Sequence, residues 1–229
     1  MTMIGRPFTG FQPEAIHFLL ELSMHNERPW FQPRKGEFER LLKEPLESLC
    51  VALGERFAAR GIPLTADERS PFRIYRDVRF SKDKSPYKTH VSASFPMASV
   101  GTEGAHGAGG YFHFQPDHCY VGGGMWHPER PRLEAWRTLV DREPGQVHAA
   151  IDDPAFTAAF GEVEGERFVR VPAGFAADHP DADLLRLKDV TFGRGLSDDE
   201  SLSPDLPDLL ADAFAAATPV IRLLAKLPM

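Results

Sequence analysis

The stretch of the chain with the most residues that could do chemistry runs from residue 73 to residue 90, RIYRDVRFSKDKSPYKTH. Six of its eighteen side chains are basic and two are acidic, whereas the whole chain of 229 residues carries a formal net charge of −7. Arginine and lysine bind carboxylate and phosphate groups, and tyrosine and histidine stack on rings and exchange protons. We therefore expect this stretch to form a binding surface for a negatively charged group.

The candidate site residues share a positive charge, an aromatic ring or a titratable side chain. The candidates for ligand binding are Arg73, Tyr75, Arg76, Arg79, Lys82, Lys84, Tyr87, Lys88, Tyr111 and His179. The candidates for proton transfer are Asp77, His90 and His113, because these titratable groups are expected to share one face of a sheet. Two acids cannot neutralise six bases, and an unpaired charge that is held away from water is costly. The surplus of positive charge therefore favours a bound anion or an acidic partner.

Alternation of apolar and polar residues predicts that this stretch forms a β-hairpin. Apolar side chains alternate with charged or aromatic ones from residue 72 to residue 81, and the alternation resumes after a loop at residues 82–87. The return strand places Lys88 and His90 on its polar side. Arg76 alone breaks the alternation, which indicates either a β-bulge or a pairing at the edge of the core.

A second hairpin, expected at residues 110–123, adds two more strands. Tyr111, His113 and Gln115 share one side of its first strand, and Phe112 and Phe114 share the other side. We therefore expect an antiparallel sheet of four or more strands in the middle of the chain, with one face packed on helices.

Helical patterns on both sides of these hairpins make the expected fold class α+β, because the strands cluster instead of alternating with helices. Pro45 is expected to kink or split the helical segment at residues 36–60. Further short strands are expected at residues 168–171 and 190–192. We expect one domain, residues 1–229, with helices at 8–60, β-hairpins at 70–124 and mainly helices at 128–228.

The composition argues against several classes of protein. A net charge of −7 does not suit broad binding to nucleic acid or to an acidic membrane, because proteins bind those negatively charged partners through a widespread basic surface. No apolar run reaches the length of a signal peptide or a membrane span, so we expect a cytoplasmic protein without a membrane partner. Cys50 and Cys119 lie in unlike contexts, which fits a reducing compartment.

Other possible sites have weaker signals. His113, His118 and Cys119 are close in sequence, but their spacing matches no standard zinc signature, so we expect neither a metal nor a cofactor. The glycines at residues 122–124 either let a ligand approach the backbone or form a bent strand end, and they lack the context of a nucleotide-binding loop. His179 is typical of a helix entry, and its convergence with the basic hairpin stays open.

Several longer motifs resemble one protein family. They are FTGFQPEAIHFLLEL, NERPWF, FRIYRDVRFSKDKSPYKTH, GGYFHFQP, GGGMWHPE and RVPAGFAADHPDADLLRLK. From about residue 8 to residue 224, the chain is similar to the family catalogued as domain of unknown function 2461. This resemblance implies no activity, cofactor or catalytic residue. The family pattern has an asparagine where His25 stands and often an acid near Gln115, so it supports no role for an amide at 25 or a carboxylate at 115.

Together these features favour a protein that binds an anionic small molecule, a phosphate or a carboxylate compound, on a basic sheet face that contains histidine and tyrosine. Such a protein is either a binding protein or a small enzyme. The alternative is a non-enzymatic protein-interaction module that uses the basic loop at residues 82–88. A nucleic-acid enzyme is less favoured, because clustered bases support it and the overall acidity opposes it.

Overall fold

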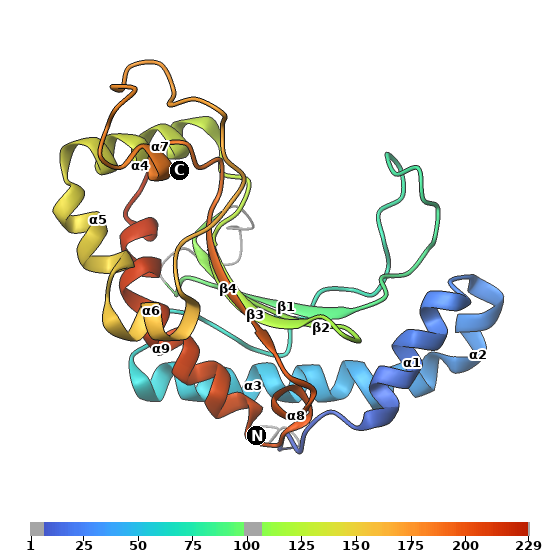
Figure 1. Ribbon diagram of the computed structural model, residues 1–229. Coiled ribbons are helices and arrows are strands. Elements are labelled where there is room, and N and C mark those ends of the chain that lie inside the picture. The colour runs from blue at the N-terminus through green and yellow to red at the C-terminus, as the bar shows by residue number, and fades with distance from the viewer. Residues whose placement is uncertain (1–6, 99–106, 229) are drawn as a thin grey trace.

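A four-stranded antiparallel sheet forms the middle of the molecule in the computed structural model, which describes residues 7–98 and 107–228 (Figure 1). The strands follow one another across the sheet in the order β1-β2-β3-β4. They are β1 (Val91–Pro96), β2 (Gly109–Phe114), β3 (Cys119–Met125) and β4 (Val190–Leu196). The α+β class and the predicted antiparallel sheet, packed by helices from both ends of the chain, are therefore confirmed.

Helices precede and follow the sheet along the sequence. Before the sheet come α1 (Pro13–Met24), α2 (Arg28–Phe38), the π-helical turn η1 (Glu39–Lys43) and α3 (Glu44–Arg60). Between β3 and β4 come α4 (Arg130–Arg142), α5 (Pro144–Ile151), α6 (Pro154–Phe160) and the short α7 (Ala182–Leu185). After β4 come α8 (Asp198–Leu202) and α9 (Leu206–Ala225). No helix in the described ranges is long and apolar enough to cross a membrane.

Helices α3 and α9 cover one face of the sheet and enclose the core with it (Figure 1). Phe57 of α3 and Phe214 of α9 meet Phe95 of β1 edge to face, with ring centroids 5.8 and 5.5 Å apart. Phe11, which precedes α1, stacks on Phe114 of β2 at 4.3 Å. All five rings are buried. Large apolar area removed from water on this face stabilises the sheet against the helices.

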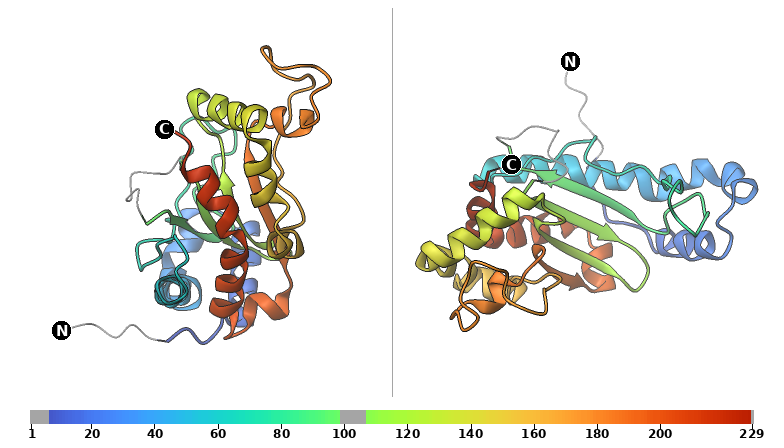
Figure 2. Two further views of the ribbon diagram at one scale, coloured as in Figure 1. Left: turned by 90° about the vertical axis from the view of Figure 1, so that its left-hand side faces the viewer. Right: turned by 90° about the horizontal axis from the view of Figure 1, so that it is seen from above.

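The opposite face of the sheet, called the polar face below, carries no helix over its centre among the described residues (Figure 2, right). Because side chains alternate along a strand, Tyr111 and His113 point away from the core that receives Phe112 and Phe114. This confirms the predicted division of the second hairpin. The register continues the polar face across the sheet, since Ser92 and Tyr120 both pair with His113.

The first predicted hairpin is different, because residues 71–90 form a projecting arm (Figure 1). Isolated bridges pair Pro71 with Ala93 and Tyr75 with Tyr87. The Lys88 N–H also donates to the Ile74 carbonyl at 2.8 Å. The two sides of the arm therefore run antiparallel, but the predicted strand at residues 72–81 is wrong.

The arm cannot form a full ladder because other groups occupy its backbone amides. The Asp77 carboxylate accepts the N–H of Arg79 at 3.2 Å, and the Asp83 carboxylate accepts the N–H of Ser85 at 2.9 Å. Such local turns compete with a β-ladder, and the Pro86 nitrogen has no N–H to donate. Arg76 is not at a bulge in a regular strand. It forms an ion pair with Asp83 across the arm.

Two further expectations about local structure have different outcomes. Residues 168–171 do not form the predicted strand, since Phe168 makes one backbone bond to Arg186 and the side chain of Val169 is 91% exposed. A strand does occur at residues 190–192, as predicted, within the longer β4. Pro45 stands in the first turn of α3, directly after η1. A wider π-helical turn there accommodates a residue that cannot donate a helical hydrogen bond.

Candidate functional site

His113 occupies the centre of the polar face and is only 6% exposed. The Tyr111 hydroxyl lies 3.0 Å from its Nδ1, and the Gln115 Oε1 lies 3.0 Å from its Nε2. An amide oxygen only accepts hydrogen bonds, so Nε2 of His113 carries the proton and Nδ1 accepts from the hydroxyl. His113 is therefore held as a neutral imidazole with both ring nitrogens engaged.

Other rings surround His113 and form a continuous cluster with it. His90, Tyr120 and His118 have ring centroids 4.3, 4.8 and 5.7 Å from that of His113. The ring centroid of Tyr111 lies 5.6 Å from that of Tyr120 and 6.4 Å from that of Phe72, which belongs to the arm. The ring cluster consists of Phe72, His90, Tyr111, His113, His118 and Tyr120.

The inner members of the ring cluster are uncharged at neutral pH. Burial, together with the nearby His113 and Lys88, lowers the pKa of His90 from 6.5 to about 4. Burial also lowers the pKa of His113, although its hydrogen bond to Gln115 acts the other way. Burial and the adjacent Tyr111 raise the pKa of Tyr120. The polar face thus presents neutral flat groups at its centre.

Two cations lie beside the ring cluster without forming an ion pair with any described residue, although Arg73 is close enough to Asp77 for its charge to help lower the pKa of that carboxyl. Lys88 places its Nζ 5.0 Å from the centroid of the Phe72 ring. Burial, and then the positive charge of Arg73, lowers the pKa of Lys88. Within the described part of the chain, neither Lys88 nor Arg73 forms an ion pair or a side-chain hydrogen bond. An anion placed between them would relieve both the mutual repulsion and the loss of solvation.

Most of the remaining charged residues of the arm are engaged near its tip, and Lys82 is the exception. Asp77 receives hydrogen bonds from the Arg79 guanidinium at 2.7 to 3.2 Å, which hold the pKa of Asp77 at about 2. Lys84 donates from its Nζ to the Val78 carbonyl at 2.9 Å. Lys82 has no ion pair or side-chain hydrogen bond among the described residues. Both acids of the arm are thus used locally, and six bases less two acids leave a surplus of four positive charges.

Tyr87 fastens the base of the arm to the helices. Its ring is 1% exposed and lies 4.1 Å from the Phe31 ring of α2 and 5.4 Å from the Tyr75 ring. Asn26 binds the main chain of Tyr87 twice, donating to its carbonyl at 2.9 Å and accepting from its N–H at 3.0 Å. The contacts of Tyr87 are those of an anchor. Nothing in the sequence patterns singled out Asn26 as its partner.

His179 lies in another part of the molecule, beside α4 and α7, which Figure 1 shows away from the arm. Its Nε2 is 3.7 Å from Asp141, and its Nδ1 accepts the N–H of Asp181 at 3.0 Å. Nearby, His148 bonds to Asp152 and Asp181 at 2.8 Å each, and these carboxylates raise its pKa. The structure therefore does not bring His179 to the arm.

Three members of the ring cluster were absent from the predicted site: Tyr120, His118 and Phe72. Tyr120 could have been found, because it alternates with the inward-facing Cys119 and Val121 along β3. Phe72 joins the cluster only because its N–H donates to the Ser92 carbonyl at 2.8 Å and so aligns the arm with β1. That registry is a tertiary contact that no local pattern reveals.

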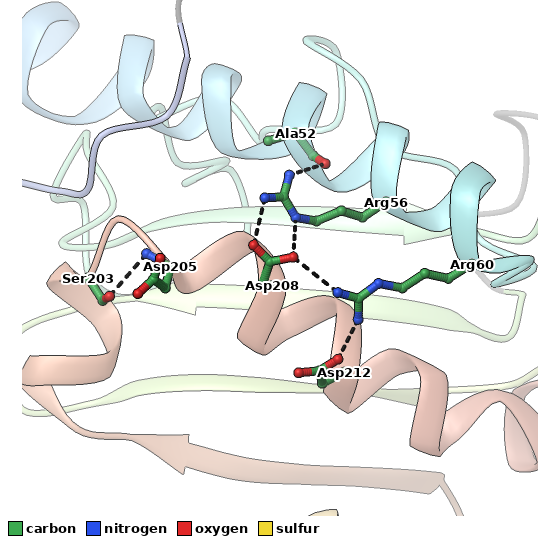
Figure 3. Close-up of polar contacts among 7 residues, drawn as sticks. All are labelled: Ala52, Arg56, Arg60, Ser203, Asp205, Asp208 and Asp212. Atoms are coloured by element: carbon green, nitrogen blue, oxygen red, sulfur yellow. Dashed lines mark hydrogen bonds and ion pairs between the residues drawn. The ribbon is translucent and has the colours of Figure 1, made fainter.

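A second group of charged residues joins α3 to α9 on the core side of the sheet (Figure 3). Arg56 forms two hydrogen bonds with the Asp208 carboxylate, at 2.8 and 2.7 Å. Arg60 reaches both Asp208, at 3.0 Å, and Asp212. These four residues are called the α3–α9 seam below, and every charge in the seam has an opposite charge beside it.

The α3–α9 seam borders a shallow depression of about 770 Å³ between α6 and α9. Most of its charged lining is already paired, since Asp208 binds Arg56 and Arg194 binds Glu200 at 3.0 Å, and the charge left over at Asp205 is negative. In residues 7–98 and 107–228, no three His, Cys, Asp or Glu side chains are arranged to hold a metal ion. The arrangement best suited to a charged ligand is therefore the edge of the polar face at Lys88 and Arg73.

Searches of the curated proteins and of the solved structures each found no match to this chain. A family model described as conserved hypothetical protein (DUF2461) matches residues 14–222. The matched range includes nearly all of α1, the arm, the sheet and most of α9, in agreement with the resemblance of the sequence motifs. The chain therefore belongs to the conserved hypothetical protein family DUF2461.

Proposed function

We propose that the polar face binds an anionic small molecule, with its negative group between Lys88 and Arg73. The observation that carries this proposal is the proximity of these two cations, one of them partly buried, neither of which forms an ion pair with a described residue. Burial, and then the positive charge of Arg73, lowers the pKa of Lys88, so both act against its charged form. A phosphate or carboxylate would supply the missing negative charge through charge-assisted hydrogen bonds.

If the bound molecule also reacts, His90 is the best placed group to move a proton. His113 has both ring nitrogens engaged, and Asp77 is bound by Arg79. The ring nitrogens of His90 have no hydrogen-bond partner among the described residues. With a pKa of about 4, His90 is neutral at pH 7, and a negative group bound beside Lys88 would raise its affinity for a proton.

A thermal-shift measurement with inorganic phosphate, citrate and acetate tests the proposal. An anion at about 100 times its Kd should stabilise the wild type by roughly 2.7 kcal/mol. Lys88→Ala and Arg73→Ala should each abolish most of this gain. Lys226→Ala, which removes the same charge from the exposed end of α9, is the matched control and should keep it. Equal stabilisation of wild type and Lys88→Ala by every anion would refute the proposal.

The second candidate function is docking of the arm on an acidic protein, and the tip of the arm favours it. Phe80 is 96% exposed, with the Arg79 guanidinium 5.8 Å from its ring centroid and the unpaired Lys82 nearby. An exposed ring within a basic rim is typical of an interface anchor. A photo-crosslinker at residue 80 should capture one defined partner, and the same group at the exposed Leu20 should not. Identical products from both positions would count against docking through the tip.

A further inference from the structure

We infer that the anionic molecule bound at Lys88 carries a planar aromatic ring, as aryl phosphates, aryl carboxylates and nucleotides do. This inference rests on the proposed anion site and names the chemical class of its ligand. It follows from three features of the polar face: the ring cluster, the one-sided distribution of charge, and the glycines of β3 and β4.

The ring cluster places a row of aromatic rings, tilted relative to one another, next to the cations. Its rings follow one another from Phe72 to Tyr111 and Tyr120, with centroid separations of 6.4 and 5.6 Å. Phe72 is 47% exposed, and Tyr111 and Tyr120 are partly exposed. Exposed rings on an otherwise polar surface favour a ligand that is itself flat, because aromatic groups stack on one another.

The charge of the site lies at one side only. Lys88 and Arg73 stand at the β1 edge, with the Lys88 Nζ beside the Phe72 ring. Further across the sheet, the buried His113 and the partly exposed Tyr120 are neutral at pH 7. A ligand that matches both parts has an anionic group at one end and an uncharged ring at the other.

Beyond Tyr120 the polar face has room for a ring, because the next positions are glycines. Tyr120 pairs with Gly195, and Gly122 pairs with Gly193 on β4. Neighbouring strands lie about 4.8 Å apart, so the distance from β1 to β4 is about 14 Å. Phenyl phosphate and benzoate are shorter than that distance, so with the anionic group beside Lys88 their ring would lie over Tyr111 and Tyr120, whereas a longer nucleotide would reach the glycines of β4.

Gly193 and Gly195 also provide a steric test that leaves the backbone undisturbed. A Cβ at Gly193 would come no closer than 3.4 Å to another atom, and a Cβ at Gly195 no closer than 4.0 Å. A Cβ at Gly122 would lie 2.4 Å from the Phe192 carbonyl oxygen, so that position is unsuitable. Gly193→Val should therefore fold and fill a part of the polar face that only a ligand longer than phenyl phosphate would reach.

The experiment measures binding of matched probes by calorimetry to the full chain. The probes are inorganic phosphate, phenyl phosphate and cyclohexyl phosphate, with acetate, benzoate and cyclohexanecarboxylate as the carboxylate set. We expect one aromatic probe to bind the wild type at least about tenfold more tightly than its cyclohexyl and inorganic or acetate counterparts, a difference of 1.4 kcal/mol. Tyr120→Leu should remove this preference without weakening the binding of phosphate or acetate, and Gly193→Val, which lies beyond the reach of these short probes, should keep it. Lys88→Ala should weaken all the probes of that set.

The outcomes separate the two proposals. If anions bind the wild type and depend on Lys88, but aromatic probes bind no better than cyclohexyl ones, the ring inference is overturned and the anion site stands. If no probe binds the wild type, both are overturned. The comparison of phenyl with cyclohexyl probes needs no variant, and melting curves of Tyr120→Leu and Gly193→Val, with Gly193→Ala as a milder replacement, show whether each is folded.

Discussion

The α3–α9 seam and the arm both concentrate basic side chains, but they satisfy them in opposite ways. In the seam, Arg56 meets an acid that is 152 residues away in sequence, so the pair connects two helices (Figure 3). In the arm, Arg79 pairs with an acid two residues away and Arg76 with one seven residues away. The seam pairs stabilise tertiary structure, whereas the arm pairs shape a loop and leave Lys88 and Arg73 without a partner.

Two buried arginines form no ion pair among the described residues, but both donate hydrogen bonds to backbone carbonyl groups. Arg132 donates to the Leu224 carbonyl at 3.1 Å, near the end of α9. Arg137 donates to the Leu185 carbonyl at 3.1 Å, in the last residue of α7. Carbonyl groups at the C-terminal end of a helix carry partial negative charge and favour cations. The fold therefore provides acceptors for these buried cations, whereas the partly buried Lys88 has neither an ion pair nor a side-chain hydrogen bond among the described residues.

The largest expected effect on stability comes from removing an ion pair of the α3–α9 seam. Arg56→Ala should lower the free energy of unfolding by about 2 kcal/mol, because it removes two charge-assisted hydrogen bonds and leaves Asp208 with only Arg60. Urea unfolding measures the loss, and a double-mutant cycle with Asp208→Ala gives the coupling energy.

Arg130→Ala is the matched control for this experiment. Arg130 pairs with Glu134 on the surface of α4, with its side chain 88% exposed. Exposed helical pairs contribute only about 0.3–0.5 kcal/mol. Equal losses for Arg56→Ala and Arg130→Ala would mean that the seam does not tie α3 to α9.

A smaller effect concerns the pH dependence of two histidines, one beside cations and one between acids. His90 has its pKa lowered from 6.5 to about 4, so its neutral form contributes stability above pH 6.5 that is lost as the pH falls toward 4. In that range the unfolded chain takes up a proton that the folded ring does not. Between pH 6.5 and pH 4, the free energy of unfolding of His90→Gln should therefore decrease by about 1 kcal/mol less than that of the wild type. This value allows for the partial exposure of the ring.

His148 provides the control of opposite sign. Asp181 and Asp152 raise its pKa above 6.5, so its contribution is complete below pH 6.5 and is lost as the pH rises through the folded value. His148→Gln should lower the melting temperature in mild acid and have less effect in mild alkali. If both variants changed the pH profile in the same direction, the contrast between the two environments would be wrong.

The sequence allowed the two faces of the sheet to be predicted, because alternation is a local property. Tyr111, His113, Lys88 and His90 were assigned to one face from a period of two, and they do share it. The same rule failed for residues 72–81, where Asp77 and Asp83 bind nearby amides and turn an alternating pattern into an irregular arm.

The rest of the candidate site depends on contacts between distant segments. Phe72 joins the ring cluster through the pairing of the arm with β1, and the anchoring of Tyr87 depends on Asn26, 61 residues earlier in the chain. His179 was separated from the arm by the packing of α7 beside α4. Net charge in a window of sequence indicated a surplus of cations, but only the structure distinguishes Lys88 and Arg73 from the cations that have partners.

The smallest expected effect is also the most direct test of whether Lys88 is unpaired. Lys88→Met keeps the apolar stem and removes a partly buried charge that Arg73 repels. Without added ligand, it should leave the free energy of unfolding unchanged or raise it by up to about 1 kcal/mol, and the gain should shrink as salt screens the repulsion. Lys82→Met, at the exposed tip, should have no measurable effect. If Lys88→Met instead destabilised the protein as Arg56→Ala does, Lys88 would be a structural partner in the folded chain, and a free position for an anion could no longer be argued from it.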